Sequence, residues 1–155
     1  MRIGAAIRRV LPVREGHAHC DIPCGIYDPI VAKIAAQTVH KMAMRIKALS
    51  SPTGDAAQAY TMTRLIAVKE HHAEICKREV DILWHDYFKP EHLTKYPDLH
   101  TLVWETTKLA SANKQNVDPD SAQKLVEKVD KIAEIFWATK GVTYSDPNAT
   151  VRFGK

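Results

Sequence analysis

The chain has 155 residues and a mass of 17.4 kDa, which is the size of one domain. Its residues are 45% hydrophobic and 26% charged, and this composition argues against disordered, collagen-like and membrane-spanning classes. Three cysteines are too few for a disulfide-rich secreted scaffold. We therefore expect a cytoplasmic protein, in which a close cysteine pair more often serves metal or redox chemistry.

The net charge of +4 is concentrated at the N-terminus. Residues 1–18 contain four arginines and one glutamate, whereas the rest of the chain has 18 basic and 17 acidic side chains. Nucleic-acid binding requires a concentrated basic face, and none is visible in the linear sequence. We expect neither a nucleic-acid partner nor a membrane partner.

Residues 1–18 end in Gly16-His17-Ala18, which resembles a peptidase cleavage site. Small residues at positions 16 and 18 fit the small-x-small pattern for cleavage before His19. Arginines interrupt the apolar centre that a secretory signal needs. From this segment alone two interpretations stay open: a pro-segment that is removed without export, or a frayed N-terminal arm.

Four amphipathic helices are predicted from apolar residues that recur at three- and four-residue steps. They cover about 29–49, 55–87, 97–112 and 119–141. Asp28-Pro29 and Asp118-Pro119 each combine an N-cap with a proline at the first helical position, and Gly141 suits the position just after the last helix. Pro90 predicts a break over 88–92. The fold class is therefore all-α: a four-helix bundle over 29–141 with a tail at 142–155.

The same spacing predicts which side chains face the core. For the first helix these are Ile30, Val31, Ile34, Thr38, Met42, Ile46 and Leu49. For the later helices they are Leu65, Ile66, Ala73, Cys76, Val80, Leu83, Trp84, Leu99, Leu102, Val103, Leu109, Leu125, Val129, Ile132, Ile135 and Phe136. Cys76 is thus interpreted as a small core residue.

An irregular segment at 19–28 carries the one cluster of metal-ligating residues. None of the eight histidines follows a glutamate by three residues, so the Glu-x-x-His pairs of di-iron bundles are missing. What remains is His19-Cys20-Asp21-Ile22-Pro23-Cys24, where two thiols beside an imidazole can ligate one soft or borderline metal ion. The spacing of the two cysteines alone fits a disulfide or half of a zinc site equally well.

Cleavage after Ala18 would change the ligands that this segment offers. His19 would gain a free α-amine, which could join the Cys20 backbone nitrogen and the sulfurs of Cys20 and Cys24 in a square-planar set, with the His19 imidazole at an axial position. Square-planar nitrogen donors favour Ni(II) or Cu(II) over tetrahedral Zn(II). Thiolate and amide donors stabilise a higher oxidation state, so such a site could cycle between Ni(II) and Ni(III).

The segment His-Cys-Asp-Ile-Pro-Cys-Gly-Ile-Tyr-Asp-Pro at 19–29 closely resembles the nickel-hook motif of nickel-containing superoxide dismutases. Segments 83–90, 95–100 and 135–140 are also similar to that family. The resemblance runs from His19 to about Lys140. It implies a four-helix subunit, a homohexamer, one nickel ion per subunit, a pro-segment removed by a dedicated peptidase, and conversion of superoxide to oxygen and hydrogen peroxide.

The resemblance also implies a set of site residues. The nickel ligands would be His19, Cys20 and Cys24. Tyr27 matches the family tyrosine that closes the substrate pocket, with Asp21 nearby, and Lys89 matches a lysine thought to attract the superoxide anion. Packing of the hook against the first helix would equally explain Tyr27 and Asp21, and Lys89 could be an ordinary solvated lysine.

Two positions depart from the family pattern. A glutamate and an arginine that orient the axial imidazole fall on Ala35 and His72 by alignment of the motifs. An alanine side chain cannot accept a hydrogen bond, and such outer partners fix the ring orientation of a ligating histidine. We predict that the square-planar set is kept and that the axial interaction differs. An axial nitrogen coupling in the oxidised protein equal to that of glutamate-bearing relatives would refute this.

Two other functions are compatible with the sequence alone. One is a non-catalytic nickel- or copper-binding helical protein that uses the same hook. The other is a helical interaction module with a disulfide between Cys20 and Cys24. The expected function is a nickel superoxide dismutase.

Overall fold

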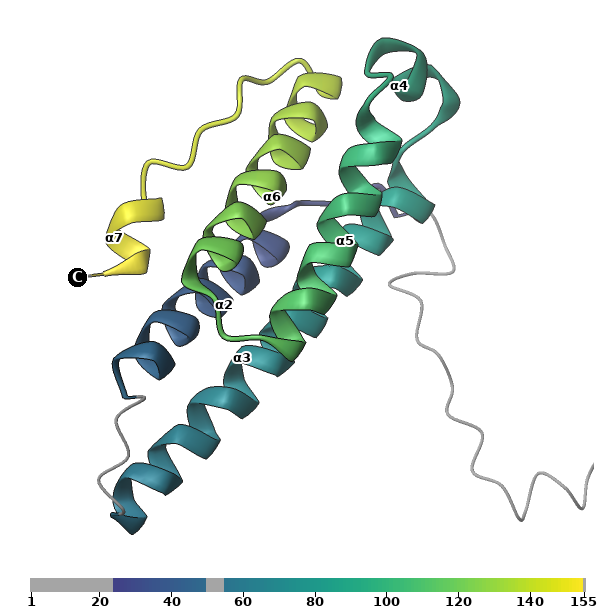
Figure 1. The fold of residues 1–155 in the computed structure, drawn as a ribbon. Helices are drawn as coiled ribbons and strands as arrows, with labels where there is room; N and C mark the ends of the chain where they lie inside the picture. The colour runs from purple at the N-terminus through teal and green to yellow at the C-terminus, as the bar shows by residue number, and fades with distance from the viewer. Residues whose placement is uncertain (1–23, 50–54, 155) are drawn as a thin grey trace, which may run out of the picture.

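The computed structural model describes residues 24–49 and 55–154, and within these residues the backbone forms helices and no strand (Figure 1). The helices are α2 (Ile30–Ala48), α3 (Ala56–Ile82), the π-helix η1 (Leu83–Tyr87), α4 (Pro90–Lys95), α5 (Leu99–Gln115), α6 (Pro119–Thr139) and α7 (Ala149–Phe153). In the described part of the chain, no helix is both long enough and apolar enough to cross a bilayer.

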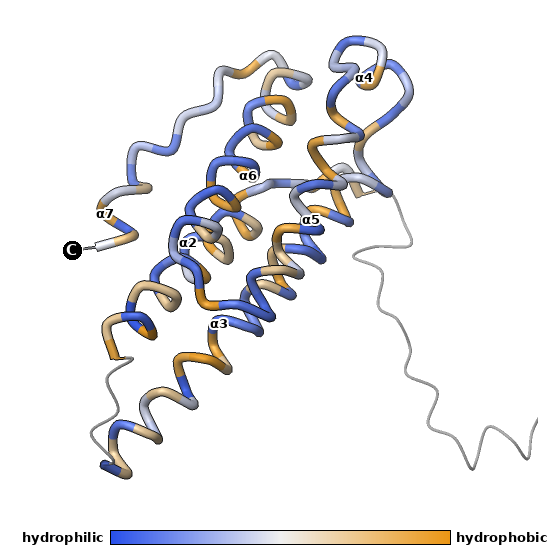
Figure 2. Tube along the Cα trace, in the orientation of Figure 1, coloured by the Kyte–Doolittle hydropathy of each residue, from blue (hydrophilic) through white to orange (hydrophobic). Residues whose placement is uncertain are grey.

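Four long helices form the bundle. α2 packs against α3 and α6, and α5 packs against the same two helices, so the four close into a ring around one core. Figure 2 shows apolar residues recurring along each of them. The predicted all-α four-helix bundle is confirmed.

Aspartates begin three of these helices. Asp28 Oδ1 accepts a hydrogen bond from the backbone N–H of Ile30 at 2.8 Å, and Asp55 and Asp118 accept from the residue two positions later at 3.0 Å. These bonds satisfy N–H groups that have no partner within the helix. At the other end of α6, Gly141 has φ +74°, the left-handed conformation that favours glycine after a helix.

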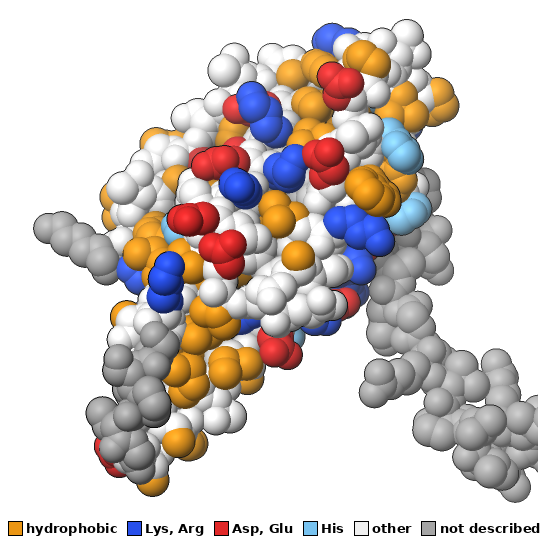
Figure 3. All heavy atoms as spheres, viewed as in Figure 1, with side chains coloured by type: hydrophobic (Ala, Val, Ile, Leu, Met, Phe, Trp, Pro, Cys, Tyr) orange, Lys and Arg blue, Asp and Glu red, His pale blue; other side chains and the backbone are white. Residues whose placement is uncertain are grey.

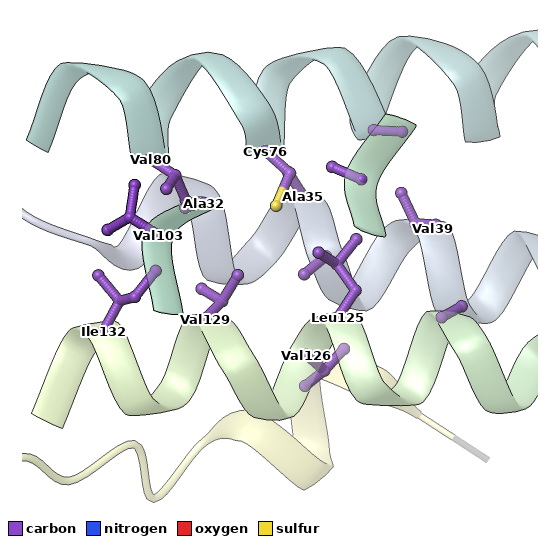
Figure 4. Close-up of a cluster of buried hydrophobic side chains, with 14 of the residues drawn as sticks. Ala32, Ala35, Val39, Cys76, Val80, Val103, Leu125, Val126, Val129 and Ile132 are labelled. Carbon is purple, nitrogen blue, oxygen red and sulfur yellow. The ribbon is translucent and has the colours of Figure 1, made fainter. Parts of the chain in front are cut away.

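The core-facing side of α2 differs from the prediction. The buried apolar side chains are chiefly alanines, Ala32, Ala35, Ala36 and Ala43, together with Val39 and Ile46. Figure 4 shows Ala32, Ala35 and Val39 among the core side chains of the other helices. Val31 and Ile34 are 45% and 42% exposed, so the larger apolar stripe that includes them points away from the core. Both stripes have helical spacing, and packing buries the smaller one because alanine lets α2 approach α3 and α6 closely.

The predicted core of the later helices is largely confirmed. Buried residues from the prediction are Leu65, Ala73, Cys76, Val80, Leu83, Leu99, Val103, Leu125, Val129, Ile132 and Phe136. Cys76 is fully buried, and burial raises the pKa of its thiol to about 12. A thiol held in its neutral form is chemically inert, which fits a packing role.

The chain breaks where Pro90 predicts it, but the break is shorter. η1 ends at Tyr87, and Phe88 and Lys89 have extended backbones. Pro90 then begins the short helix α4, since proline is tolerated at the first position of a helix. The break therefore turns the chain between α3 and α5 through a short helix rather than a loop alone.

The C-terminal segment 142–154 contains α7 and lies along the bundle (Figure 1). Arg152 forms an ion pair with Asp146 at 2.7 Å and also donates to the Gln37 side chain at 3.0 Å. Gln37 in turn donates to the carbonyl oxygen of Ala149 at 3.2 Å. These contacts hold α7 against α2.

A second attachment of this segment is centred on Asp130 of α6. The Tyr144 hydroxyl donates to Asp130 at 3.2 Å, and the buried ammonium of Lys33 pairs with the same carboxylate. Burial, followed by the nearby Asp130 charge, raises the pKa of Tyr144. The C-terminal segment thus bonds to both α2 and α6.

Acidic and basic side chains are interspersed on the face drawn in Figure 3. Lys128 of α6 and Glu105 of α5 form an ion pair at 2.6 Å.

Candidate metal centre

The described residues include the last part of the expected hook. His19, Cys20 and Asp21 lie outside the described residues, whereas Cys24 is an exposed free thiol. The next residue, Gly25, has φ +76°, so the backbone turns there in a conformation that other residues rarely adopt. Cys24 is therefore accessible and lies at a turn, six residues before α2 begins at Ile30.

Tyr27 connects the hook to the bundle. Its side chain is partly buried and packs against the hydrophobic core. The centroid of its ring lies 5.5 Å from that of Tyr87, with the ring planes at 54°. Tilted pairs at this distance are favourable, because the edge of one aromatic ring is positive and its face negative. This contact holds Tyr27 against the end of the π-helix.

Tyr87 is itself held from several sides. Its hydroxyl oxygen lies 2.6 Å from Thr139 Oγ1, and its ring centroid lies 4.5 Å from that of Phe136. The ring of His92 stacks with it at 5.7 Å. Tyr87, the last residue of η1, thus contacts residues of α4 and α6 as well as Tyr27.

Two lysines bring positive charge to this region. Lys89 is exposed and follows Tyr87 by two residues, at the start of α4. The Lys140 ammonium lies 5.2 Å from the ring centroids of both Tyr87 and Phe136. A cation within about 6 Å of an aromatic face is attracted by it. The end of the bundle that carries Tyr27 therefore carries basic groups that would attract a small anion.

The two positions that depart from the family pattern offer different chemistry. Ala35 is buried in the core cluster, and its methyl group can form no hydrogen bond. His72 is partly buried, and its Nδ1 lies 2.9 Å from the carbonyl oxygen of Val68 in the same helix. Because a carbonyl can only accept, Nδ1 carries the proton in this arrangement. The predicted change in axial interaction stays a prediction.

A cavity of about 260 Å³ opens beside the start of α2. Asp28 and Ile30 line one side of it, Trp137 lines another, and residues 142–146 close it from the C-terminal segment. Asp28 follows Cys24 by four residues, so the C-terminal segment forms a wall next to the chain that leaves the hook.

The sequence assigns no role at the site to Tyr87, Thr139 or Lys140, and it predicts Phe136 only as a core residue. Their segments, 83–90 and 135–140, were recognised only as similar to the family. The signal that could have found them is the placement of Tyr87 and Phe136 at the ends of the second and fourth helices, where both can meet Tyr27. Which pair of rings meets depends on how the helix ends align in space.

Cys24 alone cannot hold a metal ion. Among the described residues, no group of three or more histidine, cysteine, aspartate or glutamate side chains is placed to bind one. A metal site built on the Cys24 thiol would need further donors from outside the described residues.

Comparison with known proteins decides which family this arrangement represents. The sequence profile of one family, described as nickel-containing superoxide dismutase, matches residues 14–140. The chain belongs to the nickel-containing superoxide dismutase family. The match includes the whole hook and all four long helices, and it ends before the C-terminal segment that contains α7.

Individual nickel superoxide dismutases agree with this assignment. "Superoxide dismutase [Ni]" of Streptomyces seoulensis is 43% identical over 133 residues, which is 86% of this chain and 96% of that protein. The Streptomyces coelicolor protein of the same description is 43% identical over 123 residues, 79% of this chain and 88% of that one. A crystal structure of a nickel-containing superoxide dismutase in its oxidised state superimposes with a TM-score of 0.70 at 42% identity, covering 80% of this chain and all of the other.

Proposed function

We propose that the protein is a nickel superoxide dismutase that converts superoxide to oxygen and hydrogen peroxide. The observation that carries this proposal is the hook motif at 19–27 within a family match that spans 14–140. The proposed ligands are the amine and imidazole of His19, the amide nitrogen and sulfur of Cys20, and the sulfur of Cys24.

The described part of the hook fits such a site. Cys24 is exposed and forms no disulfide with a described residue, so its sulfur is accessible to a metal ion as a thiolate ligand. Gly25 provides a turn that would let the preceding residues fold back toward that sulfur. Thiolate donors suit nickel, and nickel bound there would supply the one-electron couple that both half-reactions need.

The side chains around the hook would handle the substrate. Tyr27 lies at the junction of hook and bundle, where its ring can limit the entry of water and of molecules larger than superoxide. Lys89 is exposed at the same end and would attract the superoxide anion. Asp21 is the third residue proposed to contact the substrate pocket.

Processing, assembly and location are further parts of the proposal. Cleavage after Ala18 by a maturation peptidase would give His19 the free amine that the ligand set needs. The family resemblance supports a homohexamer. The low cysteine count supports the cytoplasm, where the thiols of the hook would stay reduced until nickel binds.

The test replaces one sulfur of the hook and compares it with the buried cysteine. Cys24→Ser removes a thiolate ligand in favour of a hard hydroxyl, so we expect loss of bound nickel and of superoxide dismutation. Cys76→Ala is the matched control, because Cys76 lies in the core and is expected to affect stability alone. Nickel content, the mass of the N-terminal peptide and a superoxide assay are measured for each protein.

Three results would separate this proposal from the other functions. A native chain beginning at His19 with one nickel ion and full activity supports the enzyme. The same chain with nickel but without activity would indicate a metal-binding protein. An intact N-terminus without nickel, and with two hydrogen atoms fewer than the reduced chain, would indicate a disulfide between Cys20 and Cys24.

A further inference from the structure

Thr139, the last residue of α6, places its hydroxyl between two oxygen atoms. Its Oγ1 lies 2.6 Å from the carbonyl oxygen of Phe136 in the same helix and 2.6 Å from the phenol oxygen of Tyr87. A carbonyl can only accept, so the single proton of the Thr139 hydroxyl is donated to Phe136. The Tyr87 hydroxyl must then donate its own proton to Thr139.

Tyr87 is held both by the hydrogen bond of its hydroxyl and by the contacts of its ring. The hydroxyl is tied to α6, while the ring is held between Phe136 at 4.5 Å and His92 at 5.7 Å. Because the proton of Tyr87 points toward Thr139, Tyr87 does not offer it toward Tyr27 or the hook. In this arrangement Tyr87 supports its neighbours through the position of its ring.

The residue that Tyr87 supports is Tyr27, at a ring distance of 5.5 Å. We propose that Thr139 is a positioning residue for the reaction: it orients Tyr87, and the Tyr87 ring sets the place of Tyr27 beside the metal hook. The inference rests on the proposed nickel site for its catalytic meaning. The coupling from Thr139 to Tyr27 rests on the described contacts alone.

The rival explanation is that Thr139 only stabilises the end of its own helix. Thr107 provides the matched control, because its hydroxyl makes the equivalent bond to the Trp104 carbonyl at 2.9 Å, three residues earlier in α5. Among its described hydrogen bonds there is none to a tyrosine. Thr107→Val thus removes the same local bond without touching Tyr87.

The experiment follows the Tyr27 ring by NMR in the protein as purified, with isotope-labelled tyrosine and Tyr27→Phe to assign the signal. We expect Thr139→Val to shift this signal, Thr139→Ser to restore it, and Thr107→Val to leave it in place. Tyr87→Phe keeps Thr139 but removes the donated proton, so it must also shift the signal. Far-UV circular dichroism checks that each variant is folded.

The same variants are assayed for superoxide dismutation. A misplaced Tyr27 should lower kcat/KM by about tenfold in Thr139→Val, since small displacements at a reacting centre are costly, with the hydroxyl-bearing Thr139→Ser close to the parent. An unmoved Tyr27 signal in folded Thr139→Val and Tyr87→Phe, or an equal shift in Thr107→Val, would overturn the inference. An inactive parent protein would instead refute the proposed function, and the NMR comparison would still decide the coupling.

Discussion

Lys69 of α3 has a buried side chain, and its ammonium group lies at the C-terminal end of α5. Its side chain is 2% exposed, and Nζ donates to the carbonyl oxygens of Asn113, Lys114 and Asn116. These carbonyls belong to the last residues of the helix and its cap, which lack partners within the helix. Burial lowers the pKa of Lys69, because water no longer solvates its charge. The three bonds explain why a lysine is tolerated inside this core.

Replacing Lys69 by methionine keeps most of the side-chain volume and removes the donor. We expect the free energy of unfolding to fall by about 3 kcal/mol, because several buried carbonyls lose a charged partner. Urea unfolding followed by circular dichroism measures this. The control is Lys114→Met. The Lys114 ammonium pairs with Glu74 at 2.8 Å on the surface, so its loss should change the free energy of unfolding little. Equal effects of the two substitutions would contradict the role assigned to Lys69.

At the scale of elements, the C-terminal segment is the feature that the family match does not include. The match ends at residue 140, whereas α7 and the turn before it bond to α2 through Gln37 and to α6 through Asp130. The segment also closes one side of the cavity at the start of α2. It therefore braces the helix that follows directly after the hook.

Deletion of residues 143–155 should loosen this brace while keeping the bundle. We expect the free energy of unfolding to fall by about 2 kcal/mol, since each lost hydrogen bond between partly buried groups contributes about 1 kcal/mol. Val142 is kept because its N–H bonds to the Trp137 carbonyl at 2.9 Å and closes α6. Urea unfolding measures the shortened chain and the variant Arg152→Gln, which removes only the contacts of the arginine and should lower the free energy of unfolding less. Unchanged stability in both would show that the contacts of α7 contribute nothing.

For the whole molecule, the placement of charge matters more than its sum. The net charge of +4 lies mainly in residues 1–18, and the remaining chain is close to neutral. Lys89 and Lys140 nevertheless add positive charge near Tyr27 and Tyr87. A local positive field of this kind guides an anion toward one end of the bundle without making the protein bind polyanions in general.

Lys89→Gln should therefore slow the capture of superoxide. We expect kcat/KM to fall by about threefold or more at low ionic strength, and the difference from the parent should shrink as salt screens the field. Pulse radiolysis across a salt series measures this. Lys124→Gln makes the same change of charge on α6, about 22 Å along the helix from Thr139, and should leave the rate unchanged. A loss that does not depend on salt would assign Lys89 a role other than attraction.

The helix ends follow from the sequence, whereas the core face of α2 does not. Asp28-Pro29, Asp118-Pro119 and Gly141 mark helix ends by local chemistry, because caps and left-handed turns need only neighbouring residues. Apart from Ile46, the predicted core face of α2 is wrong, since its alanine stripe and its larger apolar stripe share one period. Pattern alone does not say which stripe the neighbouring helices will cover.

The residues of the candidate site likewise fall into those predicted from the sequence and those found from tertiary contacts. The hook ligands are predicted from a nine-residue motif that contains its own donor atoms, and Tyr27 is predicted from the family resemblance of that motif. Tyr87, Phe136 and Thr139 lie far from it in sequence, and their roles follow from ring distances and a shared hydrogen bond. Ala35 and His72 were found only as departures from a family pattern.

The sequence by itself therefore determined the four long helices to within a few residues at their ends, and it predicts the donor set of the hook and the class of metal that such donors suit. These depend on interactions within a few residues along the chain. Only the tertiary structure decided which side of α2 is buried, where the C-terminal segment rests, and which side chains support Tyr27. Those outcomes depend on close packing between distant segments, in which shape and volume select among patterns that are equivalent along the chain.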